Sequence, residues 1–248
     1  MKRPAGVILY RGPSMLANKP IVVIATFKTK NDKTGNMVQT WILRSHIKPT
    51  DALTSGGDCS VCGDCPLRNA GCYVEVGQAP QMVWKAYKRG NYPVYNPADH
   101  NQWFRGRKLR IGSYGDPTAA PYSIWAPLVR LAAGHTGYTH QWRQKRFWRF
   151  RNLVMASTET NEGSALAKSR KWRVFQTLPQ GFDVAQLPKG LVVCPASPEG
   201  GNRRQCETCL GCNGAKGNHK RVSFAIIAHG TKATVSQYTR AVVQLSTN

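Results

Sequence analysis

The chain has 248 residues, of which 41% are hydrophobic and seven are Trp, so it can bury a core and is not a disordered tail. Lys and Arg number 35 against 12 Asp and Glu, which leaves a formal net charge of +23. So strong a positive charge on a folded domain indicates a polyanionic partner, and nucleic acid is the first candidate. A basic surface that only aids solubility is the alternative.

The N-terminus lacks the charged and apolar segments of a secretion signal. No apolar run approaches the ~18 residues that span a bilayer. We therefore expect a cytoplasmic protein with no membrane partner.

Strands and helices are predicted to alternate along the chain. Runs of β-branched and aromatic residues predict strands at 20–27 and 37–46, followed by a helix at 78–90 that stops at Gly90. A buried strand at 108–117 ends in a Gly-Asp-Pro turn, and a helix at 121–134 has Pro in its first turn. Further strands are predicted at 136–142, 151–158, 172–178 and 190–197, with a helix at 162–170. This order predicts parallel βαβ units in one α/β domain over 1–248, built as a partial or open βα barrel.

All eight cysteines fall into two groups of four. The first group lies in the loop 59–72 and the second in the loop 194–212. In a reducing cytoplasm such groups are better read as metal ligands than as disulfides, so we expect two metal sites with four cysteine ligands each. Their members are Cys59, Cys62, Cys65 and Cys72, and Cys194, Cys206, Cys209 and Cys212.

The spacing within each group favours an iron-sulfur cluster over zinc for at least one site. Each group contains a C-x2-C-x2-C run, and the fourth cysteine lies further away, as in bacterial ferredoxins. In the second group the remote cysteine is followed by Pro195. Zinc also tolerates irregular loops, so both metals remain open.

Several polar residues follow predicted strands. Asp116, His140 and Glu159 each end a strand, as do the first cysteine group and Cys194. Ligands bind at the carboxyl ends of parallel strands, so the three polar residues are catalytic candidates. The alternatives are that Asp116 only shapes a turn and that His140 is a satisfied core histidine.

A basic and aromatic segment at 140–152 is the predicted nucleic-acid or partner surface. Cations neutralise phosphates and aromatic rings stack on bases. The alternative is an amphipathic helix with buried aromatic residues and solvated cations. A second basic run lies at 216–224. The candidate residues of the first segment are Trp142, Arg143, Lys145, Arg146, Trp148, Arg149 and Arg151.

Three features of the sequence resemble the plan of radical S-adenosylmethionine enzymes. They are a cysteine group after the first barrel strand, the turn Gly115-Asp116-Pro117 after the second, and an auxiliary cysteine group near the C-terminus. That resemblance implies an iron-sulfur enzyme that uses S-adenosylmethionine. The spacing departs from the C-x3-C-x2-C of that superfamily. If all four cysteines of the first group bind, no iron stays open for S-adenosylmethionine.

Stretches such as "GVILYRGPSML", "KTGNMVQTWILR", "CGDCPLR", "GYTHQWR", "CPAS" and "AIIAHG" resemble a family of phage- and plasmid-encoded proteins. Some of its members resemble the recombination directionality factors of large serine integrases. The resemblance implies an accessory protein that binds DNA or a DNA-bound integrase and promotes excision, in the cytoplasm of a bacterial host.

Two functions therefore stand after the sequence alone. The first is a metal-binding accessory protein in phage DNA transactions, whose metal sites hold loops that carry a partner surface. The second is an iron-sulfur enzyme of radical type that acts on nucleic acid or a nucleotide. Four ligands per site leave no open coordination position, which favours the first.

Overall fold

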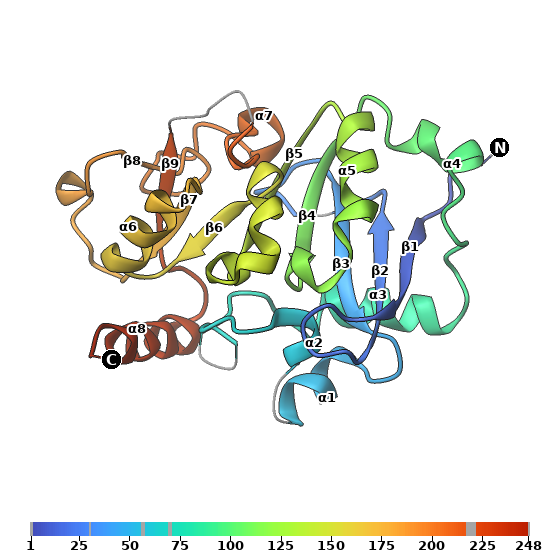
Figure 1. Cartoon of the computed structure of the whole chain (residues 1–248), viewed down its shortest axis with the longest axis horizontal. Coiled ribbons are helices and arrows are strands. Elements are labelled where there is room, and N and C mark those ends of the chain that lie inside the picture. Colours follow the sequence, from blue (N-terminus) through green and yellow to red (C-terminus); the bar gives the residue numbers. More distant parts are fainter. Residues whose placement is uncertain (1, 30, 56–57, 69–70, 217–221, 248) are drawn as a thin grey trace.

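Figure 1 shows the computed structural model of the chain. It describes all residues except 1, 30, 56–57, 69–70, 217–221 and 248, and of 243–247 it describes the backbone alone. Within these residues, nine strands form one sheet in the order β1-β2-β3-β4-β5-β6-β7-β9-β8.

The first three strands are antiparallel. β1 (Gly6–Pro13) pairs with β2 (Pro20–Thr26), which pairs with β3 (Val38–Arg44). The residues from Ile21 to Ala25 are completely buried, so β2 is covered on both faces. Such a strand needs a continuous apolar run, and its sequence PIVVIAT provides one.

The other strands run parallel to β3. They are β4 (Lys108–Tyr114), β5 (Gly134–Thr139), β6 (Met155–Thr158), β7 (Val174–Leu178), β8 (Leu191–Val193) and β9 (Ser223–Ile227). β5 pairs with β4 along 134–137 and with β6 through Tyr138 and Thr139. Its two halves therefore join the two parts of the sheet.

The predicted helices at 78–90, 121–134 and 162–170 are confirmed as α3 (Ala79–Lys88), α5 (Tyr122–Leu131) and α6 (Asn161–Ser169). The helix α8 (Lys232–Thr247) and the strands β1 and β9 are not among the predicted elements. Thr160 caps α6, because its Oγ1 accepts a hydrogen bond from Gly163 N at 3.1 Å. The helices are α1 (Pro49–Thr54), α2 (Cys59–Cys62), α3 (Ala79–Lys88), α4 (Pro97–His100), α5 (Tyr122–Leu131), α6 (Asn161–Ser169), α7 (Cys206–Cys209) and α8 (Lys232–Thr247). Short 3-10 helices are η1 (Asn101–Trp103), η2 (Pro117–Ala119), η3 (Gln141–Arg143), η4 (Lys145–Asn152) and η5 (Val184–Gln186).

The two faces of the parallel strands have different surroundings. On β4, Leu109 and Ile111 are fully buried in the same core cluster as Trp125 of α5, which lies over this part of the sheet in Figure 1. Successive side chains of a strand point to opposite faces, so Arg110 and Tyr114 face the other side. That second face carries the candidate site.

The predicted α/β class is confirmed. The sheet is mostly parallel and open, with β1 and β8 as its edge strands. The barrel-like curvature stays a prediction. In the described part of the chain, no helix is both long and apolar enough to cross a bilayer.

Candidate functional site

A cavity of about 220 Å³ lies on the second face of the parallel sheet. Residues of five strands line it, most of them alternate residues, in keeping with the two-residue period of strand side chains. Thiols of both cysteine groups also line it. The strand residues include Arg110 and Tyr114 of β4, Thr136 and Tyr138 of β5, Phe175 of β7 and Phe224 of β9.

In the first cysteine group, three thiols differ in position from the fourth. Cys62, Cys65 and Cys72 line the cavity, whereas Cys59 lies outside its lining. Cys59 and Cys72 are both exposed. Burial raises the pKa of the Cys62 thiol well above its ordinary value, and the nearby Cys65 and Cys72 raise it further. These three thiols therefore line the same cavity, although they are not gathered closely enough to hold a metal ion.

The second cysteine group contacts the turn before β3 and the strand β5. Cys206 N donates to Lys33 O at 2.9 Å, and Lys33 belongs to the turn that precedes β3. Cys212 O accepts a hydrogen bond from Gly137 N of β5 at 3.0 Å. All four thiols of this group line the cavity, and Cys194 and Cys212 are buried.

Cys194 directly follows β8, as predicted, but α7 of the second cysteine group lies at the other end of the sheet from the first group. In Figure 1, α2 lies at the lower end of the strands and α7 at the upper end. The reason is the short β8, which pairs with the first half of β9, so that Cys194 N donates to Ala225 O in mid-strand. The two cysteine groups therefore line one cavity from opposite ends of the sheet.

All eight cysteines are free thiols. Among the residues that the structure describes, no three Cys, His, Asp or Glu side chains are gathered closely enough to hold a metal ion. The donor type suits zinc or an iron-sulfur cluster, but the thiols do not converge on one point. The two four-cysteine metal sites therefore stay a prediction.

Asp116 joins the ends of two neighbouring strands. Its carboxylate accepts hydrogen bonds from Thr118 N at 3.0 Å, Thr118 Oγ1 at 2.7 Å and Thr139 Oγ1 at 2.8 Å. It also accepts one from His140 N at 2.9 Å. Burial raises the pKa of Asp116, and the hydrogen bonds from Thr118 and His140 oppose that rise. Because these donors already occupy both oxygens, the geometry supports a structural role for this catalytic candidate.

His140 and Glu159 meet at the edge of the cavity near the first cysteine group. His140 Nε2 lies 2.9 Å from Glu159 Oε1 and 3.9 Å from Cys65 Sγ. Burial lowers the pKa of His140, but Cys65 and Glu159 outweigh that effect and raise it above its ordinary value. The structure therefore brings together three of the predicted site residues.

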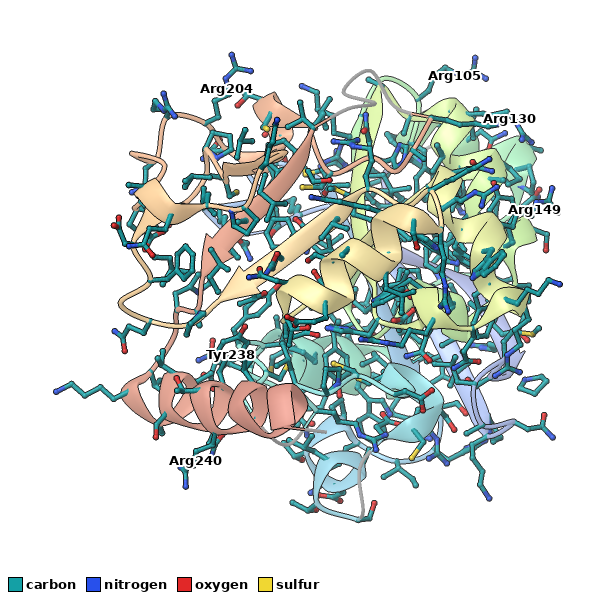
Figure 2. The ribbon with its side chains drawn as sticks, turned by 60° about the vertical axis from the view of Figure 1, so that its left-hand side comes forward. Arg105, Arg130, Arg149, Arg204, Tyr238 and Arg240 are labelled. Atoms are coloured by element: carbon teal, nitrogen blue, oxygen red, sulfur yellow. The ribbon has the colours of Figure 1, made fainter. Side chains whose placement is uncertain are left out.

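The C-terminal helix covers another side of the cavity. Thr234, Val235 and Tyr238 of α8 line it. Tyr238 is 2% exposed, and its hydroxyl donates to Thr177 O at 2.7 Å. Figure 2 shows Tyr238 directed from α8 toward the strands and Arg240 directed away.

The basic and aromatic segment lies outside the cavity. Trp142 is completely buried and donates from Nε1 to Ser157 O at 2.8 Å, so the prediction that its ring stacks on bases is wrong. Phe147 and Phe150 are also buried. Trp148 is half-buried, as is Arg151. This arrangement matches the alternative of buried aromatic residues beneath solvated cations, because the aromatic side chains complete the core.

The cations of this segment remain available to a partner. Arg143, Lys145, Arg146 and Arg149 are exposed. Arg149 lies 4.3 Å above the ring of Tyr122, the first residue of α5. Figure 2 shows Arg149 on the same side of the molecule as Arg130. Arg130 belongs to α5, as Tyr122 does. Of the second basic run, residues 217–221 lie outside the described residues.

Sequence reasoning misses two cations of the cavity, Lys33 and Arg110. The signal for Arg110 is a charged residue in the middle of a strand that is otherwise predicted to be buried. Lys33 has no comparable signal, because a lysine in a polar turn is ordinary. No model of a protein family matches this chain, and no curated protein and no solved structure is significantly similar to it.

Proposed function

We propose that this protein is an iron-sulfur enzyme of the radical S-adenosylmethionine type, which acts on a nucleotide or nucleic acid in the cavity between its cysteine groups. The observation that supports this most is the position of Cys59. It lies outside the lining of the cavity, while Cys62, Cys65 and Cys72 line it. A set of three thiols would leave one position open, as a catalytic site requires.

Thiolates are soft ligands that suit an iron-sulfur cluster, and in the proposed enzyme Cys62, Cys65 and Cys72 would hold it. The described structure does not gather these thiols closely enough for a metal ion, so the proposal rests on the donor type and on the lining of the cavity. A bound and reduced cluster would supply the electron that cleaves S-adenosylmethionine. In the proposed enzyme, the residues of the chain hold the cluster loop in position and enclose the substrate. Asp116 N donates to Val61 O at 2.7 Å, which ties the end of β4 to α2.

The His140–Glu159 pair is the group in this site that can hold or move a proton. Its 2.9 Å contact places the Nε2–H of His140 toward the carboxylate, with Cys65 beside it. The exposed fractions of the two side chains are 17% and 3%, so water has little access to the pair. In the proposed enzyme, His140 and Glu159 exchange a proton with the substrate at the edge of the cavity.

The test compares Cys59→Ser with Cys65→Ser after anaerobic reconstitution with iron and sulfide. We expect Cys59→Ser to keep the broad visible absorption and to form deoxyadenosine from S-adenosylmethionine with a reductant. Cys65→Ser should lose both. If wild-type protein with bound iron and sulfide forms no deoxyadenosine, the enzyme proposal fails. Equal loss in both variants would indicate a closed site with four ligands.

A second candidate is the accessory role, a recombination directionality factor that binds a serine integrase on DNA. The exposed cations of η3 and η4 favour it, because they form a basic surface away from the cavity. A factor that biases a complex acts by differential binding, so it should permit excision at a nearly stoichiometric ratio to the integrase. An enzyme would act at a much lower ratio. This candidate function would be removed if no serine integrase responds to the protein.

A further inference from the structure

Arg110 is a buried cation without an anionic partner. It is 6% exposed, its Nη1 makes a long contact of 3.4 Å with Thr136 Oγ1, and the Tyr138 side chain is a further hydrogen-bond partner. Its guanidinium lies 4.4 Å from the centre of the Tyr138 ring. Within the described residues, no Asp or Glu lies at ion-pair distance from it. Burying an unpaired charge is costly, and a guanidinium has five N–H donors to satisfy.

Arg173 shows how this fold treats a buried arginine that has only a structural role. It is 4% exposed, and it donates to Val222 O at 2.7 Å and to Gly211 O at 2.7 Å. It also donates to Asn213 Oδ1 and to Gly214 O, both at 2.9 Å. Arg173 lies outside the lining of the cavity, whereas Arg110 faces into it. The contrast indicates that the donors of Arg110 are kept for a ligand.

A second cation, Lys33, lines the same cavity, and its Nζ lies 3.1 Å from His229 Nε2. Asp116 is the carboxylate among the described lining residues, and its oxygens already accept hydrogen bonds. In the described lining, the cavity therefore presents two cations whose charge no carboxylate is free to balance. A phosphate monoester carries about −1.5 to −2 charges near pH 7 and has three acceptor oxygens, which matches this pair better than a carboxylate does.

The rest of the lining is aromatic. Tyr138 packs against Phe175, with ring centroids 4.4 Å apart, and Phe175, Phe224 and Tyr73 are further aromatic residues of the lining. Flat apolar walls beside a cation suit a ligand that joins a phosphate to an aromatic ring. We propose that the cavity binds a nucleoside monophosphate, with its phosphate on Arg110 and Lys33. This inference rests on the proposed function, since it names the substrate class of the same site.

The experiment is calorimetric titration of the purified protein with the four deoxynucleoside monophosphates, their nucleosides and inorganic phosphate. We expect at least one monophosphate to bind more tightly than its nucleoside and than phosphate. Arg110→Met should weaken that binding about 10- to 100-fold, because charge-assisted hydrogen bonds are lost. Arg110→Lys should restore part of it. Arg130→Met is the control, because Arg130 is exposed on α5 outside this cavity, and it should bind like the wild type.

Circular dichroism and thermal unfolding show whether each variant is folded. Arg110→Met removes an unpaired buried charge, so it should fold at least as well as the wild type. The inference is overturned if folded wild-type protein binds no monophosphate, or if Arg110→Met binds it equally well. It is also overturned if Arg110→Met loses iron and not affinity, which would mean that Arg110 balances the second cysteine group. Arg110-dependent binding without deoxyadenosine formation would instead remove the radical enzyme and keep this site.

Discussion

Replacement of Gly115 by Ala should disturb the contact between β4 and the first cysteine group. Gly115 has a φ of +83°, a left-handed conformation that costs other residues about 1–2 kcal/mol. A Cβ at this position would lie 2.7 Å from both Ile42 Cβ and Val61 Cγ1, and 3.0 Å from Ile42 O. Ile42 and Val61 are completely buried, so neither can move without disturbing the core.

The expected loss of unfolding free energy in Gly115→Ala has two contributions, and Gly90→Ala is the control that separates them. Overpacking of a dense core adds about 1–3 kcal/mol to the conformational cost, so Gly115→Ala should lower the free energy of unfolding by about 2–5 kcal/mol. Gly90 has a similar φ of +75°, but a Cβ there would meet nothing within 4 Å. Gly90→Ala should therefore show the conformational cost alone, about 1–2 kcal/mol.

The assay is urea unfolding followed by Trp fluorescence, with the slope of the free energy against urea checked for equality among the proteins. The reactivity of the cysteine thiols in the folded protein gives a second measurement. Because Val61 belongs to the loop of the first cysteine group, thiol labelling of Cys62 should be faster in Gly115→Ala than in Gly90→Ala. Equal destabilisation by the two substitutions would refute the steric argument.

Two further predictions concern pH and salt. Burial lowers the pKa of His135, so the folded state binds fewer protons than the unfolded state just below the ordinary value of about 6.5, and stability should fall as the pH drops through that range. His135→Gln should make this fall smaller in urea unfolding at about pH 7.5 and pH 5.5, and an unchanged fall would contradict the assignment. If the exposed cations of η4 contact phosphates, neutralising Lys145, Arg146 and Arg149 together should reduce the slope of log affinity for DNA against log salt by about 3. An unchanged slope would place the DNA contact elsewhere.

Much of the fold can be predicted from local patterns. The predicted strands from residue 20 to 178 and the helices α3, α5 and α6 are confirmed, because period and turn residues are local properties of the chain. β1 and β9 are missed although "GVILY" and "SFAII" are rich in β-branched and aromatic residues. Spacing along the chain also shows that the thiols form two groups, and the strand pattern places Asp116, His140 and Glu159 after strands.

Which of these residues share a site depends on how the loops pack on the sheet. The spacing of cysteines does not show which strands a loop packs against. It therefore could not place the second cysteine group against the turn before β3 and the strand β5. It also could not show that Cys59 lies outside the cavity or that Trp142 lies in the core. Which face of β4 meets the helices and which faces the cavity depends on the packing of α5, and that choice directs Arg110 into the cavity while Leu109 and Ile111 enter the core.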